Sequence, residues 1–502
     1  MIFRLLYKLY KIRLLSFIGI FYLLRAIRRS GTNLMTLLDI AAALHPKSIA
    51  IVEASAKISY PELAEQATQV ANALYQQYQI RPKMKVAIAC RNHSAHLKAI
   101  FAVSRIGAHQ YLLNPEMTLA QFQAIQERHQ FDFIIYDADI AELVSTLGIV
   151  GLDELAIDKL SAQVTAPKAP RLKRASSGKL VVLTGGSTGT PKLAARKPSI
   201  FDFLPPLFAL LQQVELDKFK SVFIATPIYH GFGVASVFTA MVLGAELHLL
   251  PKFNAQTANN MIADHKIEVV TLVPLMLQRM LLENPEQLLS LQRIIAGGAP
   301  LSPALAQQTI ESLGLVLYNL YGTSEAGFCI LSTAQDLQQA PTSIGRAVQG
   351  VRLKILDAQD QVLALGKVGH IAIRSSWSIN KKNWIKTGDV GYLDKEGRVF
   401  LCGRIDDMIV SGGENVYPIE LENILTQHPD IEVAAAIGVA DSEFGQRLKA
   451  FVVLSPKSNL DKAALLAWLK PRVARYQMPV DIEFRTSLPL TALDKIDKKK
   501  LY

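Results

Sequence analysis

Short apolar runs alternate with amphipathic segments over most of the chain. Runs at 85–89 and 131–136 have the length and apolar content of buried strands, whereas 61–77 and 94–106 repeat apolar residues at helical spacing. Beyond residue 221 the alternation continues. There it predicts strands at 222–226, 246–250, 268–273, 293–296 and 315–320, with a helix between successive strands. This order predicts parallel βαβ units and therefore an α/β fold.

The pattern changes in the last third of the chain. From about residue 341 it gives short strands separated by turns, at 345–356 and 369–374, which predict a small β-barrel-like subdomain. Residues after about 404 return to helical patterns mixed with valine and alanine runs, which predict a small α/β domain. We therefore expect three parts: a segment over 1–33, a large N-terminal domain over 34–403, and a C-terminal domain over 404–502.

Composition narrows the class of protein. A chain of 502 residues, 50% of them apolar, has room for about two to four domains with sizeable cores. Its three cysteines, Cys90, Cys329 and Cys402, are too few and too widely spaced for a disulfide framework or a typical zinc site. Seven of the eleven net positive charges lie in residues 1–30, which hold no acidic residue. The basic balance therefore belongs to one end, and we expect no nucleic-acid partner.

The first 30 residues are basic and apolar. On one continuous helix, a single face would carry Arg4, Lys8, Lys11, Leu15, Ile18, Tyr22, Arg25 and Arg29. The charge-free run over 14–24 is shorter than the ~20 residues that cross a bilayer. No small-residue cleavage site follows that run, so a signal peptide is disfavoured. We expect a cytoplasmic protein whose N-terminal helix lies in the inner surface of the membrane. The alternative is a helix docked on the protein's own body or on a partner.

A loop over 183–192, with the sequence LTGGSTGTPK, follows a buried strand-like run at 179–184. Its glycines let backbone N–H groups approach an anion, and its hydroxyls and lysine add donors and charge. Its sequence does not match the P-loop pattern of kinases and GTPases. We therefore expect a different polyphosphate-binding loop, although an ordinary surface loop would have a similar composition. Its candidate ligands are Thr184, Gly185, Gly186, Ser187, Thr188, Gly189, Thr190 and Lys192.

This loop resembles the phosphate-binding signature of the adenylate-forming (AMP-binding) superfamily. Further motifs of that family follow in its order: AGGAP at 296–300, NLYGTSE at 319–325, KTGD at 386–389, GRIDD at 403–407, SGGENV at 411–416 and LPLTALDKI at 488–496. The resemblance runs from about residue 34 to the C-terminus and is closest to bacterial fatty-acyl-CoA synthetases. It implies a large N-terminal domain, a mobile C-terminal domain, and ATP, Mg²⁺ and coenzyme A as cofactors.

The resemblance also implies roles for individual residues in forming an acyl-adenylate. Tyr321 would lie against adenine, Ser324 would contact the α-phosphate, and Glu325 would hold the metal. Asp389 would accept hydrogen bonds from the ribose hydroxyls, Arg404 would support ribose and phosphate, and Lys495 would bridge the substrate carboxylate and the α-phosphate. The other nucleotide-site candidates are Gly298, Ala299, Gly322 and Thr323. Solvated turn acids, or a lysine of the basic C-terminal run, are the alternative interpretations.

The resemblance assigns the second half-reaction to the C-terminal part. Asp406 would be the hinge of a domain rotation, and Gly412, Gly413 and Glu414 would line the path of the pantetheine arm. His230 would lie at the entrance of the acyl pocket, unless it serves only to end a strand. Three positions depart from the family pattern: a short segment at 375–386, and Leu193 and Asp494 where glycines are usual.

Together these features predict an ATP-dependent, AMP-forming fatty-acyl-CoA synthetase for medium- or long-chain acids. One alternative is a fatty-acyl-AMP ligase that loads an acyl carrier protein. A further alternative is a membrane-bound fatty-acid binding or uptake protein with little catalysis.

Overall fold

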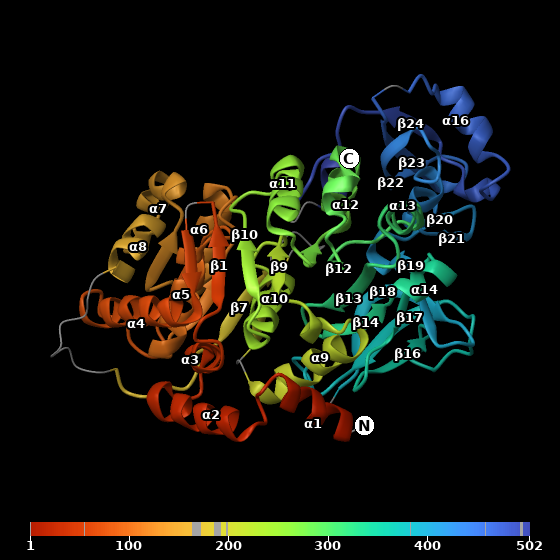
Figure 1. Ribbon diagram of the computed structural model, residues 1–502. Coiled ribbons are helices and arrows are strands. Elements are labelled where there is room, and N and C mark those ends of the chain that lie inside the picture. The colour runs from red at the N-terminus through yellow and green to blue at the C-terminus, as the bar shows by residue number, and fades with distance from the viewer. Residues whose placement is uncertain are drawn as a thin grey trace. The chain divides into compact units, whose positions relative to one another are not determined.

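The computed structural model describes residues 2–54, 56–162, 172–184, 192–196, 199–381, 383–456, 458–491 and 495–502 (Figure 1). It divides into two compact units. The first comprises Met1–Leu272 and Glu286–Ile294, and the second comprises Val273–Pro285 and Ile295–Tyr502. Both units combine helices with β-sheets, so the predicted α/β class is confirmed.

One sheet of the first unit has the strand order β6-β5-β3-β4-β7-β8, and only β7 and β8 pair in antiparallel fashion. Its strands are β3 (Lys85–Ala89), β4 (His109–Leu112), β5 (Phe133–Tyr136), β6 (Gly151–Asp153), β7 (Leu180–Thr184) and β8 (Lys192–Arg196). Its helices include α4 (Tyr60–Gln76), α5 (Ser94–Ile106), α6 (Leu119–His129), α7 (Ala141–Thr146) and α8 (Glu154–Ala162). A capping box between Ser59 and Glu62, with proline in the first turn, fixes the start of α4. The strands predicted at 85–89 and 131–136 and the helices predicted at 61–77 and 94–106 are confirmed as β3, β5, α4 and α5.

The first unit also contributes the strands β11-β9-β10-β1-β2 to a second sheet, parallel except for the β1–β2 hairpin. These strands are β1 (Ile49–Glu53), β2 (Ala56–Ser59), β9 (Ser221–Ile224), β10 (Glu246–Leu249) and β11 (Val269–Leu272). Helix α9 (Ile200–Gln213) precedes β9, whereas α10 (Gly231–Val242) and α11 (Ala255–His265) connect β9 to β10 and β10 to β11. The parallel βαβ arrangement expected beyond residue 221 is therefore present.

The N-terminal residues form two helices, α1 (Ile2–Lys11) and α2 (Phe17–Ser30), ahead of α3 (Leu34–Leu44). Arg13 has a φ of +63°, and the Ser16 side chain accepts a hydrogen bond from the Gly19 N–H at the start of α2. A single helical face running from the first basic residues to Arg29 is therefore wrong, because the chain turns between the two helices. Among the described residues, no helix is both long enough and apolar enough to cross a membrane.

The second unit begins with helix α12 (Pro274–Glu283) and contains the strand order β16-β17-β18-β19-β15-β14-β13-β12. Pairing is antiparallel from β13 to β16. The strands are β12 (Arg293–Gly297), β13 (Leu317–Thr323), β14 (Gly327–Ser332), β15 (Ser343–Ala347), β16 (Arg352–Leu356), β17 (Gly369–Arg374), β18 (Ile385–Leu393) and β19 (Arg398–Arg404). Helices α13 (Pro303–Leu313) and α14 (Ala334–Gln339) connect strands of this sheet.

The C-terminal tail has its own sheet, β21-β20-β23-β22, with β24 beside β23. It comprises β20 (Ile409–Ser411), β21 (Glu414–Val416), β22 (Ile431–Asp441), β23 (Gly445–Leu454), β24 (Asp481–Phe484), α15 (Pro418–Leu425) and α16 (Lys462–Leu469). Leu421, Leu448 and Leu465 are among the fully buried residues of its core. The predicted boundary at residue 404 falls inside the second unit and stays a prediction.

Candidate active site

Four polar side chains predicted from the motifs lie together in the second unit. Asp389 on β18 is the register partner of Arg404 at the end of β19, so the pairing of these strands places a carboxylate beside a guanidinium. Arg404 Nη1 donates to Asp389 Oδ1 at 3.1 Å, and the Tyr321 hydroxyl on β13 donates to Oδ2 at 2.5 Å. Lys495 lies near both charged partners, since each shifts its pKa.

Asp389 is the centre of this cluster. Its residue surface is 8% exposed, and this burial raises the pKa of the carboxyl above its usual 3.8. Hydrogen bonds from Tyr321 and Arg404 oppose that shift. Burial and the adjacent carboxylate also raise the pKa of Tyr321 well above 10, so its hydroxyl remains a donor. An ionised carboxylate accepts about four hydrogen bonds, and Asp389 therefore retains acceptor capacity for a pair of hydroxyls.

The two residues before Asp389 shape its surroundings. The Asp389 N–H donates to Thr387 Oγ1 at 3.2 Å, and this hydroxyl donates in turn to the Ile371 carbonyl at 3.2 Å. Gly388 has a φ of +82°, and a Cβ there would lie 2.7 Å from Arg404 Nη2. Glycine at this position thus allows both the positive φ of the turn and the close approach of the Arg404 guanidinium. Thr387 and Gly388 belong to the KTGD motif at 386–389, but the motif alone does not mark them as site residues.

Lys495 lies against Gly298, a residue of the AGGAP motif at 296–300. A Cβ on Gly298, which has a φ of +79°, would lie 3.8 Å from Lys495 Cε, so the lysine side chain passes over the glycine. The Thr491 N–H donates to the Lys495 carbonyl at 2.7 Å. Burial and Arg404 lower the pKa of Lys495, and Asp389 raises it. Asp494 lies outside the described residues.

The turn between β13 and β14 carries the remaining motif residues. The pairing of these strands shifts register between Tyr321 and Gly322, and Thr323 Oγ1 accepts a hydrogen bond from the Ala326 N–H at 3.0 Å. Ser324 is half-buried and Glu325 is exposed. An accessible carboxylate fits a hydrated Mg²⁺, which usually keeps several waters and takes one or two protein carboxylates. Ala299 follows β12 and is half-buried.

The short segment at 375–386 packs on this turn. The Ile379 N–H donates to the Glu325 carbonyl at 2.8 Å, and Trp377 Nε1–H donates to the Phe328 carbonyl at 3.0 Å. The buried indole of Trp377 thus ties the segment to β14. Nothing in the sequence connects Trp377 with the site, although a tryptophan in a short segment is often an anchor.

The phosphate-loop candidates belong to the first unit. Thr184 and Lys192 are register partners of the antiparallel pair β7 and β8, which brackets the loop. The loop residues Gly185, Gly186, Ser187, Thr188, Gly189 and Thr190 lie outside the described residues, as do the side chains of Thr184 and Lys192. Their predicted role in binding phosphate stays a prediction.

His230 precedes α10 in the same unit. Its N–H donates to the Pro227 carbonyl at 3.1 Å, and its ring centroid lies 4.5 Å from that of Tyr229. A Cβ on Gly233 would lie 2.1 Å from the Pro227 carbonyl oxygen, so only glycine fits this turn. The turn fixes the position of His230, whose predicted place near an acyl group stays a prediction.

Comparison with known families decides between the interpretations of these motifs. The model of the AMP-binding enzyme family matches residues 38–380, and that of the AMP-binding enzyme C-terminal domain matches 420–495. The chain belongs to the AMP-binding enzyme family. Enzymes of its CoA-ligase type use ATP, Mg²⁺ and CoA. The predicted cofactors are thereby confirmed, and so is the predicted class of AMP-forming ligase.

Curated relatives of this AMP-binding enzyme act on several kinds of acid. It is 28% identical to a feruloyl-CoA synthase of an Amycolatopsis species over 91% of the chain and 96% of the relative. It is also 28% identical to the fatty acid–[acyl-carrier-protein] ligase ScoC of Streptomyces coeruleorubidus, over 91% and 93%. Among solved structures, the amide bond synthetase McbA of Marinactinospora thermotolerans is 26% identical, with a TM-score of 0.80 over 90% of this chain and 96% of McbA.

The predicted hinge and pantetheine residues lie in the C-terminal part of the AMP-binding enzyme. Asp406 Oδ2 accepts a hydrogen bond from Arg404 Nη2 at 3.4 Å. Gly412 and Gly413 have φ values of +59° and +91° and form the exposed turn between β20 and β21, followed by Glu414. The turn needs both glycines for its backbone. A hinge motion and a contact with pantetheine stay predictions.

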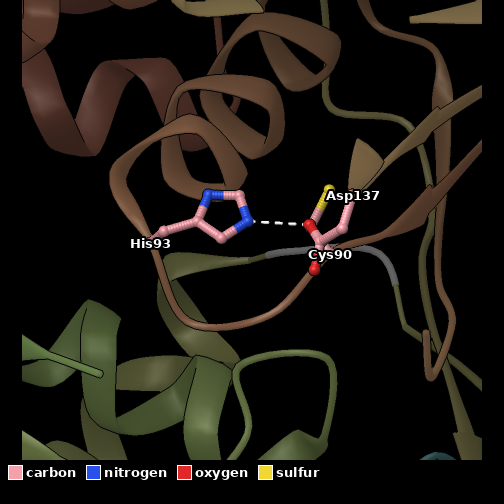
Figure 2. A group of neighbouring side chains, drawn as sticks. All are labelled: Cys90, His93 and Asp137. Carbon is pink, nitrogen blue, oxygen red and sulfur yellow. Dashed lines mark hydrogen bonds and ion pairs between the residues drawn. The ribbon is translucent and has the colours of Figure 1, made fainter. Parts of the chain in front are cut away.

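A separate cluster of Cys90, His93 and Asp137 lies in the first unit, where their potential ligand atoms are within 4.8 Å of one another (Figure 2). His93 Nδ1 accepts from the His96 N–H, which leaves Nε2 to donate to Asp137 Oδ1 at 2.8 Å. Asp137 Oδ2 accepts from Arg91 Nη1 at 2.8 Å. Burial raises the pKa of the Cys90 thiol well above 9.0. These features indicate a buried ion-pair network that holds β3 against β5 rather than a metal centre.

Proposed function

We propose that this AMP-binding enzyme activates a fatty acid as its acyl-adenylate and transfers the acyl group to coenzyme A. The cluster of Tyr321, Asp389, Arg404 and Lys495 carries the proposal, because it combines an acceptor for two hydroxyls with two cations in one place. A protein that only binds or carries fatty acids has no use for such a set.

Each member of the cluster then has a role. Asp389 would accept the ribose hydroxyls of ATP through lone pairs that Tyr321 and Arg404 leave available. Lys495 would neutralise charge where the substrate carboxylate approaches the α-phosphate, an electrostatic effect that is large in a site sheltered from water. Exposed Glu325 would hold Mg²⁺ on the phosphates.

The acid itself is proposed from the relatives. ScoC, by name a fatty acid–[acyl-carrier-protein] ligase, matches nearly the whole chain, which supports both a fatty acid and the alternative of a carrier-protein acceptor. Feruloyl-CoA synthase and an indoleacetate–CoA ligase of Aromatoleum aromaticum, each 28% identical, favour an aryl acid as the second candidate.

Pyrophosphate release by the purified protein tests these proposals. The assay would compare short- to long-chain fatty acids with ferulate and indoleacetate, each with and without CoA. Turnover with fatty acids only when CoA is present supports the main proposal, whereas preference for the aryl acids overturns it. Release that stalls near one equivalent and resumes with an acyl carrier protein would assign the alternative acceptor.

A pair of lysine variants tests the residue roles. Lys495→Ala should abolish pyrophosphate release and leave retention of fatty acid unchanged. Lys500→Ala is the matched control, because Lys500 is an exposed lysine five residues further along the same segment. Equal activity of the two variants would remove Lys495 from the mechanism.

A further inference from the structure

The outer face of α2 is apolar and exposed. Phe17, Phe21 and Leu24 repeat at helical spacing and are 96%, 61% and 62% exposed, which is unusual for such large apolar side chains. Ile18 and Ile20 flank them at 63% and 42%. Contiguous apolar surface of this kind marks an interaction site rather than the normal scatter of single exposed residues.

The opposite face of α2 is packed, so the apolar side chains cannot turn inward. Ala26 is buried in a cluster with Ile40 and Leu44 of α3, and Tyr22 and Leu23 pack against that cluster. Figure 1 shows α2 next to α3 in the first unit. The prediction of a helix docked on the protein's own body therefore holds for one face, and the other face is left uncovered in the part of the chain that the structure describes.

Ion pairs hold α1, the helix before α2, against the protein. Lys8 and Lys11 of α1 contact Asp217 at 2.7 Å and 3.2 Å, and the Asp217 side chain is fully buried. Burial alone would raise the pKa of Asp217, but the two lysines hold it below its usual value. These lysines are thus committed to an internal contact, and the cations that face outward must come from α2 and the turn before it.

The outward charges are all basic. Arg13, Arg25 and Arg28 are exposed, and so is Arg29, which also contacts Asp39 at 3.7 Å. Residues 1–30 hold no acidic side chain. Arg28 continues the stripe of Phe17, Phe21 and Leu24 by one further turn of the helix. Arginine at this position keeps its charge at the level of lipid headgroups while its aliphatic stem lies along apolar surface.

We propose that α2 docks this enzyme on a bilayer rich in anionic lipid, with the stripe of Phe17, Phe21 and Leu24 inserted into the interface and the arginines on the headgroups. An amphipathic helix with such a face lies in the membrane plane and needs no spanning segment. A second copy of this chain is a poorer occupant, because pairing two such faces would bring arginines against arginines. The proposal is independent of which acid the enzyme activates.

Vesicle flotation of the full-length protein tests the proposal. We expect it to float with phosphatidylcholine vesicles containing roughly a quarter phosphatidylglycerol, and far less with phosphatidylcholine alone. The triple variant Phe17→Ser, Phe21→Ser, Leu24→Ser should lose binding by about a thousandfold, since each buried large apolar side chain contributes roughly tenfold. Arg25→Gln with Arg28→Gln should lose only the preference for anionic lipid.

The control variant replaces equally exposed leucines elsewhere, with Leu282→Ser, Leu289→Ser and Leu365→Ser. It should float like the wild type. The proposal is overturned if the wild type does not float, if the α2 triple variant floats equally well, or if light scattering shows a dimer that this variant dissociates. Pyrophosphate release with soluble acids should be the same in all variants, so a failure here is separable from a failure of the proposed function.

Discussion

Replacing Tyr321 by phenylalanine removes one hydrogen bond from a buried carboxylate and little else. The hydroxyl donates to Asp389 Oδ2, while Arg404 serves the other oxygen at 3.1 Å. Leaving a buried acceptor without its donor costs about 1–3 kcal/mol, with charged acceptors toward the upper end. For a cooperative unit of roughly 150–250 residues, each kcal/mol moves the melting temperature by about 2–4 °C. We therefore expect Tyr321→Phe to lower the melting temperature of the second unit by about 2–12 °C at pH 8.

The effect should depend on pH in a defined direction. Burial raises the pKa of Asp389 above 3.8 in the folded protein, and the hydroxyl of Tyr321 works against that rise. The ionised carboxylate is the form that needs the donor. The difference between wild type and Tyr321→Phe should therefore be largest well above the folded pKa of Asp389, and should disappear as the pH falls through it.

Differential scanning calorimetry of the ligand-free protein, from pH 8 down to the ordinary carboxyl pKa of 3.8, measures both quantities. The transition that the variant lowers should be the one that added AMP raises. Tyr392→Phe is the matched control, because Tyr392 also lies on β18 and its hydroxyl has no hydrogen-bond partner among the described residues. A shift below 1 °C, an equal shift in the control, or a shift independent of pH would refute this account of Asp389.

Three further changes give distinct outcomes. Gly388→Ala should raise the KM for ATP several-fold because its Cβ displaces Arg404, whereas Gly397→Ala, with a φ of +73° and open space, should lower only the melting temperature. Lys495→Met should raise the melting temperature of the ligand-free protein, because burial lowers the pKa of the lysine and so disfavours its charged form in the folded state. This gain in melting temperature should be full below the folded pKa of Lys495 and should shrink as the pH rises from there toward the ordinary lysine value of 10.5. Arg91→Met should destabilise the first unit by about 3–5 kcal/mol in urea unfolding, because it removes the guanidinium partner of the buried Asp137 carboxylate.

The sequence predicted the strands well because apolar runs report burial locally. The expected runs at 222–226 and 246–250 correspond to β9 and β10 within two residues at each end. Both are short and mostly apolar, and each is followed by a proline, which is typical of the end of a strand. Element type and order therefore followed from the chain alone.

The convergence of the site residues could not be predicted in the same way. Tyr321 is 68 residues from Asp389 in the sequence, and Asp389 is 15 residues from Arg404. They meet through strand pairing, and apolar periodicity fixes which face a residue occupies but not which residue lies opposite. Only the motif resemblance indicated the cluster, and it could not supply Thr387 or Gly388 as the residues that hold it.

The break in the N-terminal helix was missed for a different reason. Arg13 adopts a positive φ although arginine has no preference for it, so composition gave no warning there. Ser16 was the available signal, because a serine before an apolar helical run is a common N-cap. The break matters for function, since it frees α2 to expose one face while the lysines of α1 stay on Asp217.

The charged side chains of the active site lie in buried positions, where they contribute little to the stability of the fold. Burial shifts the pKa of Asp389 upward and that of Lys495 downward, so in both cases burial works against the charged form that binds a nucleotide or an anion. A fold optimised for stability alone would replace such groups with apolar ones. Their persistence beside Arg404 and Tyr321 is therefore best explained by a ligand that hydrogen-bonds to the carboxylate and carries negative charge to the lysine, as a ribose phosphate does.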